Sequence, residues 1–283
     1  MIRSGDAPLF DLDAYLAHIG LPGPRTPDAD TLRALNRAHL YTVPFENLDP
    51  IRGIAPSLAV EDLVAKLIHG GRGGYCYEHN TLFATALEAL GFRVTRLAAR
   101  VLVGAGGAIR PRTHMCLLVD VPGEDDRFLA DVGFGAAGSL IEAVPLVADT
   151  EFRAGTRRHR LVHAPHDGPL EMWVLQAYES AEDGGAGTWA DQYAFTIEPF
   201  EAPDYEVINW HIATNPRSPF SRTLYVQRVT DDTHLSLANR RLTETRADGT
   251  RTERDVTDEE LPAVLTATFG ITPPEGLPPL AGS

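Results

Sequence analysis

Cysteine is scarce in this chain, and neither long apolar runs nor clusters of basic residues occur in it. The 283 residues include only 2 cysteines, too few for the disulfide framework of a small secreted domain. Free thiols are expected, with a single Cys76–Cys116 disulfide left open as the alternative. No run approaches the ~18 apolar residues of a membrane-spanning helix, and the first residues lack the apolar segment of a signal peptide. We therefore expect a soluble, cytoplasmic protein.

The charge balance is acidic. The formal net charge is -14, and the sequence pI is about 5.1. Arginine far outnumbers lysine, but the arginines are scattered along the chain. Nucleic acids and anionic membranes attract clustered basic residues, so neither is an expected partner. With 43% hydrophobic residues the chain can bury a sizeable core, as one large domain or as two to three small ones.

The apolar pattern changes twice along the chain. The first third has helical spacing, the middle has strand-like alternation, and the last part mixes both, with a hairpin signal at Ala247-Asp248-Gly249 and a capping box at Thr257–Glu260. Because the helices stop before the strands begin, we expect an α+β protein with separate layers. The expected helices cover about 28–40, 61–69, 77–90 and 257–270, and the expected strands 92–103, 112–121, 126–134, 158–164, 172–178 and 192–198. Flexible loops are expected at 104–107 and 181–187, with a loose, Pro-rich tail from residue 272.

The stretch RGGYCYEHN, residues 72–80, places Cys76 where a helix begins. A helix N-terminus offers free N–H groups and a partial positive charge, which favour a thiolate and stabilise an oxyanion formed beside it. Gly73 and Gly74 are expected to allow a tight entry and to leave room above the sulfur for an acyl group. The alternative is a cysteine that merely packs beneath the first helical turn.

A nucleophilic cysteine needs a histidine base and a group that orients it. His114 lies in one apolar strand and Asp131 in the next, and a buried carboxylate is costly unless it is paired. Cys76, His114 and Asp131 therefore form the candidate triad. His79 competes as the base, although no acid is in position to orient it. Cys116 competes as the nucleophile, but its strand lacks a helix dipole, so we interpret it as a packing residue.

Two other site types find little support. Residues 133–138 match the GxGxxG pattern of dinucleotide-binding proteins, but no βαβ unit surrounds them. The sequence has no P-loop motif for phosphates, and Cys76 and His79 lack the second ligand pair of a zinc site. We expect no metal.

Four motifs together resemble the arylamine N-acetyltransferases, and the actinobacterial members most closely. They are RGGYCYEHN, Val43–Leu48, Thr113–His114 and Asp131–Gly135, and the resemblance runs from about Asp11 to Gly270. It implies three parts: a helical bundle over 1–91 that carries the cysteine, a β-barrel over 92–200 that carries the histidine and aspartate, and an α/β lid over 201–283. It also implies that the triad is arranged as in papain or transglutaminase.

The resemblance implies a ping-pong reaction. Cys76 would accept the acetyl group of acetyl-CoA, with His114 as the base and Asp131 as its orienting group. The acetyl group would then pass to an arylamine, a hydrazine or an N-hydroxyarylamine. Phe45, Val101, Phe134 and Phe220 match positions that line the family's acceptor pocket, with plain core packing left open for Phe45 and Phe134. Glu46 and Arg72 match a structural ion pair.

Three alternatives stay open at this point. The same triad would serve a cysteine amidase or hydrolase, in which water resolves the acyl-enzyme. Some relatives form macrolactam amides in antibiotic biosynthesis. A binding module with an inert Cys76 is the non-enzymatic alternative. The oligomeric state is left open, a homodimer included.

Overall fold

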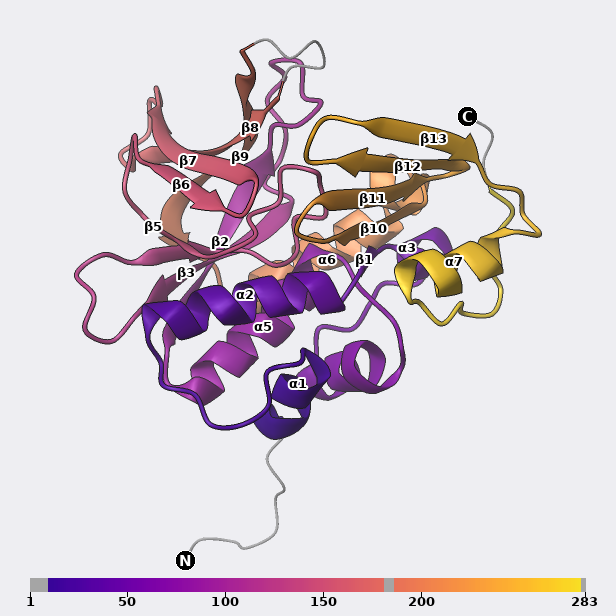
Figure 1. The fold of residues 1–283 in the computed structure, drawn as a ribbon, viewed down its shortest axis with the longest axis horizontal. Coiled ribbons are helices and arrows are strands. Elements are labelled where there is room, and N and C mark those ends of the chain that lie inside the picture. The colour runs from indigo at the N-terminus through magenta and orange to yellow at the C-terminus, as the bar shows by residue number, and fades with distance from the viewer. Residues whose placement is uncertain (1–9, 181–185, 281–283) are drawn as a thin grey trace, which may run out of the picture.

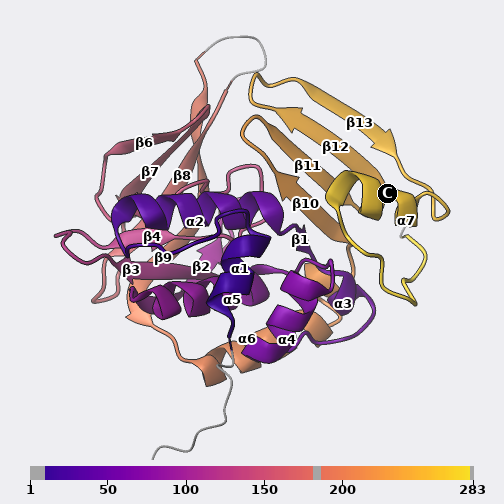
Figure 2. The same ribbon diagram turned by 60° about the horizontal axis from the view of Figure 1, so that its bottom comes forward.

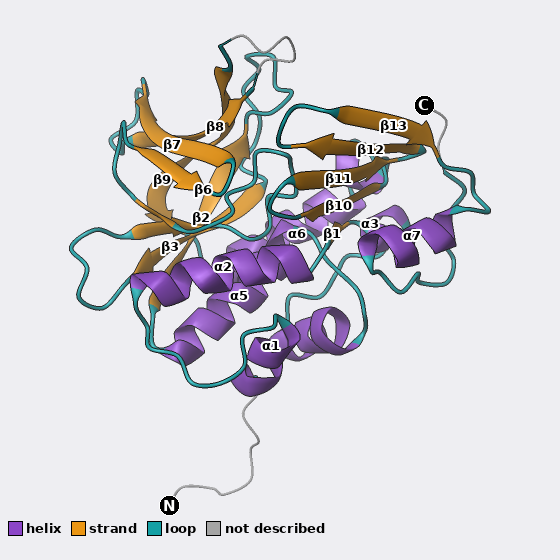
Figure 3. Ribbon diagram, in the orientation of Figure 1, coloured by secondary structure: helices purple, strands orange, loops and turns teal. Residues whose placement is uncertain are grey.

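A helical layer and two antiparallel sheets make up the protein (Figure 1). The computed structural model describes residues 10–180 and 186–280. The first nine residues, on which the signal-peptide prediction rests, and residues 181–185 of the expected loop at 181–187 lie outside this range. Helices gather on one side of the molecule and strands on the other, as the colouring by element type makes plain (Figure 3).

The helices predicted in the first third are present, with one irregularity. The residues expected to form one helix over 61–69 divide into a short α-helix and a π-helix, Val64–His69. The N-cap Asp28 accepts a hydrogen bond from the Thr31 amide, and Gly91 ends the longest helix in the left-handed conformation. The helices are α1 (Leu12–His18), α2 (Ala29–Thr42), α3 (Leu48–Ile51), α4 (Val60–Leu63), η1 (Val64–His69), α5 (Cys76–Leu90), α6 (Ala202–Thr214), η2 (Pro219–Ser221) and α7 (Leu261–Phe269).

The middle of the chain forms an eight-stranded sheet that curls into a nearly closed barrel. Its order is β5-β4-β3-β2-β9-β8-β7-β6, with every named pair antiparallel. Ala148, just after β5, bridges to Leu161 of β7, so the two ends of the sheet approach each other. All six predicted strands are found among β2 (Arg93–Val101), β3 (His114–Asp120), β4 (Phe128–Ala130), β5 (Val144–Pro145), β6 (Glu151–Ala154), β7 (Arg157–Ala164), β8 (Met172–Glu179) and β9 (Thr188–Pro199).

The second sheet combines one N-terminal strand with four C-terminal strands. Its order is β1 (Phe45–Glu46), β10 (Tyr225–Val229), β11 (Thr233–Ala238), β12 (Arg241–Arg246) and β13 (Arg251–Asp255). Helix α7 covers one face of it, where its apolar residues join the same core (Figure 2). The expected hairpin is β12–β13. β1 is too short for a periodicity, so its pairing could not be predicted.

The C-terminal tail is attached to the rest of the protein. The Thr272 amide donates to the Gly71 carbonyl at 2.7 Å. The Leu280 amide donates to Asp258 Oδ1 at 2.8 Å, and its side chain is buried. The prediction of a loose tail is therefore wrong over residues 272–280, because its apolar and backbone groups find partners that the local sequence does not reveal.

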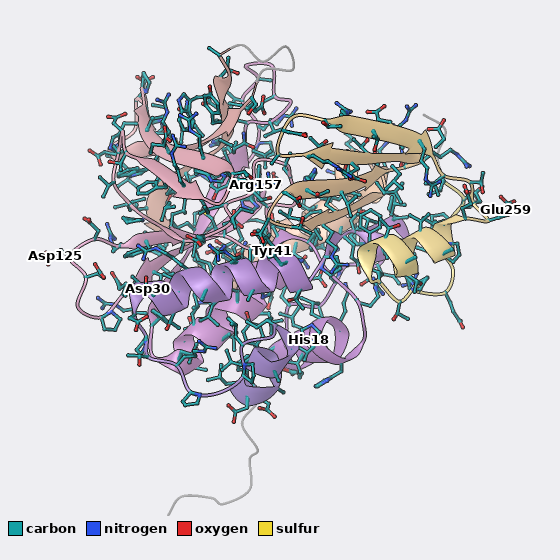
Figure 4. The ribbon with its side chains drawn as sticks, in the orientation of Figure 1. His18, Asp30, Tyr41, Asp125, Arg157 and Glu259 are labelled. Carbon is teal, nitrogen blue, oxygen red and sulfur yellow. The ribbon has the colours of Figure 1, made fainter. Side chains whose placement is uncertain are left out.

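The three layers meet around Tyr41, at the C-terminal end of α2, and Arg157, at the start of β7 (Figure 4). The Tyr41 hydroxyl donates to Asp231 Oδ1, in the turn between β10 and β11, at 2.8 Å. Thr156 donates to the carbonyl of the same aspartate. Within the described ranges, no helix is both long and apolar enough to cross a lipid bilayer.

Candidate active site

Cys76 is the first residue of α5. The residue before it, Tyr75, has an extended backbone, and its amide donates to Glu78 Oε2 at 3.1 Å. This bond satisfies one of the N–H groups at the helix start. Cys76 is 5% exposed and lines a large cleft. Cys76 and Cys116 are both free thiols.

Gly73 and Gly74 allow the tight entry to α5 that the sequence predicts, because neither position has space for a side chain. A Cβ on Gly73 would lie 1.9 Å from the Pro44 carbonyl oxygen, and a Cβ on Gly74 would lie 2.7 Å from Glu78 Oε2. The space beside both glycines is therefore filled by other parts of the protein. The expectation that they leave room for an acyl group is wrong.

His114 and Asp131 form a buried pair. His114 opens β3 and Asp131 follows β4, and these two strands are antiparallel neighbours. His114 Nε2 lies 2.6 Å from Asp131 Oδ2. The imidazole also contacts the rings of Phe134 and Tyr193, with centroids 5.1 and 4.9 Å away. The ring is thus fixed on three sides and lines the same cleft as Cys76.

Asp131 is held by partners on other elements. Its Oδ1 accepts from Asn80 Nδ2 at 3.0 Å and from the Gly133 amide at 2.9 Å. The Asp131 amide donates to Asn36 Oδ1 at 3.2 Å. Asn80 also accepts from the Val132 amide. Sequence reasoning missed Asn36 and Asn80, although an asparagine within a helix disfavours that helix unless it has such partners.

The electrostatics of the pair favour a charged imidazole. Burial alone would lower the pKa of His114, but the Asp131 charge and hydrogen bond, together with a contribution from Cys76, raise it to about 10. Burial would raise the pKa of Asp131, yet His114, Asn80 and the Gly133 amide hold it below its usual value. At neutral pH the pair is therefore an imidazolium beside a carboxylate.

The loop after β4 closes tightly onto the start of α5. A Cβ on Gly133 would lie 2.7 Å from the Cys76 Cα and 2.9 Å from Asn80 Nδ2. Only glycine permits this approach, which brings the Asp131 loop against the helix that carries the thiol.

The competing residues lie in other settings. His79 is buried and bonds to His39 and to the Pro44 carbonyl, and it does not line the cleft. Burial lowers its pKa to about 4. Cys116 is fully buried in the barrel core, where burial raises the pKa of its thiol well above the usual value. Neither is arranged as a base or a nucleophile.

The cleft has a volume of about 710 Å³. Phe45, Val101, Phe134 and Phe220 all line it, beside Cys76 and His114. Its lining also includes the basic residues Arg110, His211 and Arg217. The cleft thus combines an apolar wall with the guanidinium groups of Arg110 and Arg217.

Glu46 and Arg72 belong to a larger charge network than expected. Arg72 Nη2 lies 2.7 Å from Glu46 Oε1 and 3.2 Å from Asp49 Oδ1. Lys66 Nζ, on the π-helix, lies 2.6 Å from Asp49 Oδ2 and 2.7 Å from Glu78 Oε1. Lys66 is the single lysine of the sequence. The network links β1, α3, the π-helix and the first turn of α5.

No group of three or more histidine, cysteine or acidic side chains suited to a metal ion occurs within residues 10–180 and 186–280.

Known proteins are similar to this chain along almost its whole length. A family model described as N-acetyltransferase matches residues 28–275. The arylamine N-acetyltransferase of Mycolicibacterium smegmatis is 40% identical over 265 residues, which is 93% of this chain and 92% of that protein. The arylamine N-acetyltransferase of Escherichia coli K12 is 34% identical over 262 residues, which is 92% of this chain and 88% of that protein.

Solved structures give the same result. The crystal structure of Nocardia farcinica arylamine N-acetyltransferase superimposes with a TM-score of 0.85 at 41% identity, covering 94% of this chain and 90% of that one. Mycobacterium marinum arylamine N-acetyltransferase, solved in complex with CoA, superimposes with a TM-score of 0.82 at 34% identity, covering 93% of each chain.

Proposed function

Because this chain belongs to the arylamine N-acetyltransferase family, we propose that it transfers the acetyl group of acetyl-CoA to an arylamine, a hydrazine or an N-hydroxyarylamine through a thioester on Cys76. The observation that carries this proposal is the buried His114–Asp131 pair, 2.6 Å apart, in the cleft that Cys76 also lines. The arrangement has the three roles of a papain- or transglutaminase-like triad.

In the first half-reaction the Cys76 thiolate attacks the acetyl carbonyl carbon of acetyl-CoA. A carbon–sulfur bond forms, and the oxyanion lies near the N–H groups at the start of α5. The bond to the CoA sulfur then breaks, and the His114 imidazolium gives its proton to the leaving thiolate. Cys76 contributes to the raised pKa of His114, so acetylation of the sulfur makes that proton easier to release.

In the second half-reaction the amine nitrogen attacks the Cys76 thioester. Neutral His114 takes the amine proton, and the bond to the Cys76 sulfur breaks, which restores the thiolate and the imidazolium. Asp131 keeps the ring oriented throughout. An arylamine suits this step because its low basicity leaves the nitrogen unprotonated at neutral pH.

The cleft lining supports the proposed substrates. Phe45, Val101, Phe134 and Phe220 offer an apolar wall for an aromatic ring and exclude water from the thioester. Arg110 and Arg217 are suited to the phosphates of CoA. The relatives named above are N-acetyltransferases, which favours acetyl transfer over hydrolysis or macrolactam formation.

The division of the chain into 1–91, 92–200 and 201–283 remains part of the proposal. It is supported by the two separate sheets and by the helical layer. The reducing cytoplasm is the proposed compartment, because the reaction needs a free thiol at Cys76.

The test follows the two half-reactions by rapid quench and peptide mapping. Acetyl-CoA alone should label Cys76 and release one CoA per chain, and an added arylamine should remove the label as its N-acetyl product appears. Rapid loss of the label to water, with no amine product, would instead indicate a hydrolase.

A further inference from the structure

We propose that His79 is a positioning residue for the acetyl acceptor: through a buried hydrogen-bonded chain that starts at Tyr15, it fixes the Pro44 carbonyl and thereby the Phe45 wall of the cleft. This inference rests on the proposed function of Cys76. It gives a role to the histidine of RGGYCYEHN, which the triad does not use.

The chain of hydrogen bonds runs through three helices. The Tyr15 hydroxyl of α1 lies 2.9 Å from His39 Nδ1 of α2. His39 Nε2 lies 3.0 Å from His79 Nδ1 of α5. His79 Nε2 lies 3.2 Å from the Pro44 carbonyl oxygen. The three side chains are at most 1% exposed, so water does not compete for these bonds.

The partners fix the direction of every bond. The Pro44 carbonyl can only accept, so His79 carries its proton on Nε2. Burial lowers the pKa of His79 to about 4 and holds the pKa of His39 well below its usual value, so both rings are neutral. His79 Nδ1 then accepts from His39 Nε2–H, and His39 Nδ1 accepts from the Tyr15 hydroxyl. Only this set of proton positions gives each polar side-chain atom of Tyr15, His39 and His79 a hydrogen-bond partner.

The charged groups around this chain lie on several elements. Lys66 on the π-helix and Asp131 after β4 act on His79, and His18 at the end of α1 acts on His39. Burial is the largest cause for both histidines, and Lys66 and His18 lower the pKa values in the same direction. Of these charged groups, only Asp131 acts to raise the pKa of His79, so both imidazoles stay neutral.

The Pro44 carbonyl is clamped from two sides by the same motif. Gly73 permits its close approach, since a Cβ there would lie 1.9 Å from the oxygen. His79, six positions later, donates to it. The next peptide is also fixed, because the Glu46 amide donates to the Gly74 carbonyl at 2.8 Å. The catalytic loop therefore holds the backbone on both sides of Phe45.

Phe45 connects this fixed backbone with the cleft. Its ring is stacked on His79, with centroids 6.3 Å apart and an interplanar angle of 12°. The Phe45 ring also lies near that of Phe220, with centroids 6.2 Å apart, and both rings line the cleft. His114 and Asp131 do not take part in the hydrogen bonds that run from Tyr15 to Pro44. Changes at His79 should therefore alter the amine half-reaction more than the acetylation of Cys76.

The experiment compares His79→Gln with His79→Asn. A glutamine amide nitrogen reaches about as far as Nε2 and can still donate to Pro44, whereas an asparagine amide reaches only about as far as Nδ1. Acetyl-CoA should load Cys76 in both variants within about threefold of the unchanged protein. In the asparagine variant KM for the arylamine should rise roughly tenfold, as for one lost buried hydrogen bond, and the glutamine variant should restore most of this loss.

The outcomes separate the two proposals. Absence of acetyl on Cys76 in the unchanged protein would overturn the proposed function and this inference together. Normal loading with an equal amine KM in both variants would overturn the inference alone. A parallel impairment of loading and of amine KM would do the same. If His79→Asn does not fold, Tyr15→Phe removes only the far donor; an unchanged amine KM in that variant would overturn the inference, and a smaller rise of KM would support it.

Discussion

Asp131 meets more separate partners than any other side chain of the proposed triad. It bonds to a histidine on β3, an asparagine on α5 and the Gly133 amide. Because it is buried, its charge acts with little screening from water. The state of His114 therefore depends on this one carboxylate.

Replacing Asp131 with asparagine should slow the acetylation of Cys76 by about 10²- to 10⁴-fold. Without the charge, burial is opposed only by the contribution of Cys76, so the pKa of His114 should fall from about 10, and less of the charged imidazolium should be present at pH 7.5. Single-turnover labelling with acetyl-CoA measures the rate. Asp120→Asn is the matched control, since Asp120 pairs with an exposed Arg93. A rate within about threefold of the control would contradict the role given to Asp131.

Lys66 compensates a carboxylate beside the thiol. Burial raises the pKa of Glu78, to about 7, while Lys66 acts to lower it. Lys66→Met should leave Glu78 protonated at pH 7 and lower the free energy of unfolding by about 3–5 kcal/mol. Urea unfolding measures this. The exposed Arg93→Met is the control, with an expected loss of about 0–1 kcal/mol, and adding Glu78→Gln to Lys66→Met should recover part of the loss. Equal stability of the two single variants would count against the network.

At the scale of elements, β1 joins the N-terminal part to the lid sheet, and Asn47 secures this joint. Asn47 Nδ2 donates to the carbonyls of Phe220 and Thr223 at 2.7 and 2.8 Å. Its Oδ1 accepts from the Tyr225 amide at 2.7 Å. The asparagine of the Val43–Leu48 motif thus ties the cleft residue Phe220 to the strand that carries Phe45.

Asn47→Asp should loosen this joint, because an oxygen would face two carbonyl oxygens. The expected loss of stability is about 2–5 kcal/mol, from two unpaired buried acceptors and a buried charge. Hydrogen exchange should speed up at residues 220–225 before it does in the barrel. Asn215→Asp is the control, because Asn215 is only half-buried and the oxygen that accepts from the Arg217 amide is kept in aspartate. Protection at 220–225 equal to that of the control would show that Asn47 does not hold the lid.

At the scale of the whole molecule, four buried neutral histidines shape the response to acid. Burial lowers the pKa of His79, His159 and His234 to about 4, and that of His39 well below its usual value. Between pH 6.5 and about 4 the unfolded chain binds protons that the folded chain does not, so stability falls as the pH falls. Each unmatched proton contributes about 1.4 kcal/mol per pH unit. Glu78, whose pKa is raised, opposes this with a single group.

His114 makes stability fall as the pH rises. Its pKa is raised to about 10, so its contribution to stability is complete below pH 6.5 and is lost as the pH rises towards 10. Stability should therefore peak near pH 6.5. Urea unfolding from pH 4 to 10 tests this, and His114→Gln should flatten the alkaline side only. A stability that rises steadily from pH 6.5 to 10 would contradict the charged His114–Asp131 pair.

The sequence predicted those features whose cause is local. The three early helices, the six barrel strands and the His114–Asp131 pairing follow from apolar spacing and from the cost of a buried carboxylate. The pairing of β1 with β10, the attachment of the tail and the contacts of Gly73 and Gly74 depend on residues far away in the chain. The π-helix over Val64–His69 could not be told from an α-helix, because both have nearly the same apolar spacing.

The most direct test of the proposed mechanism is the intact mass of the protein after brief incubation with acetyl-CoA alone, with peptide mapping of the product. One acetyl group is expected, on Cys76, and it should be lost when an arylamine is added and reappear in the N-acetyl product. An unlabelled Cys76, or an acetyl group on Cys116 instead, would contradict it.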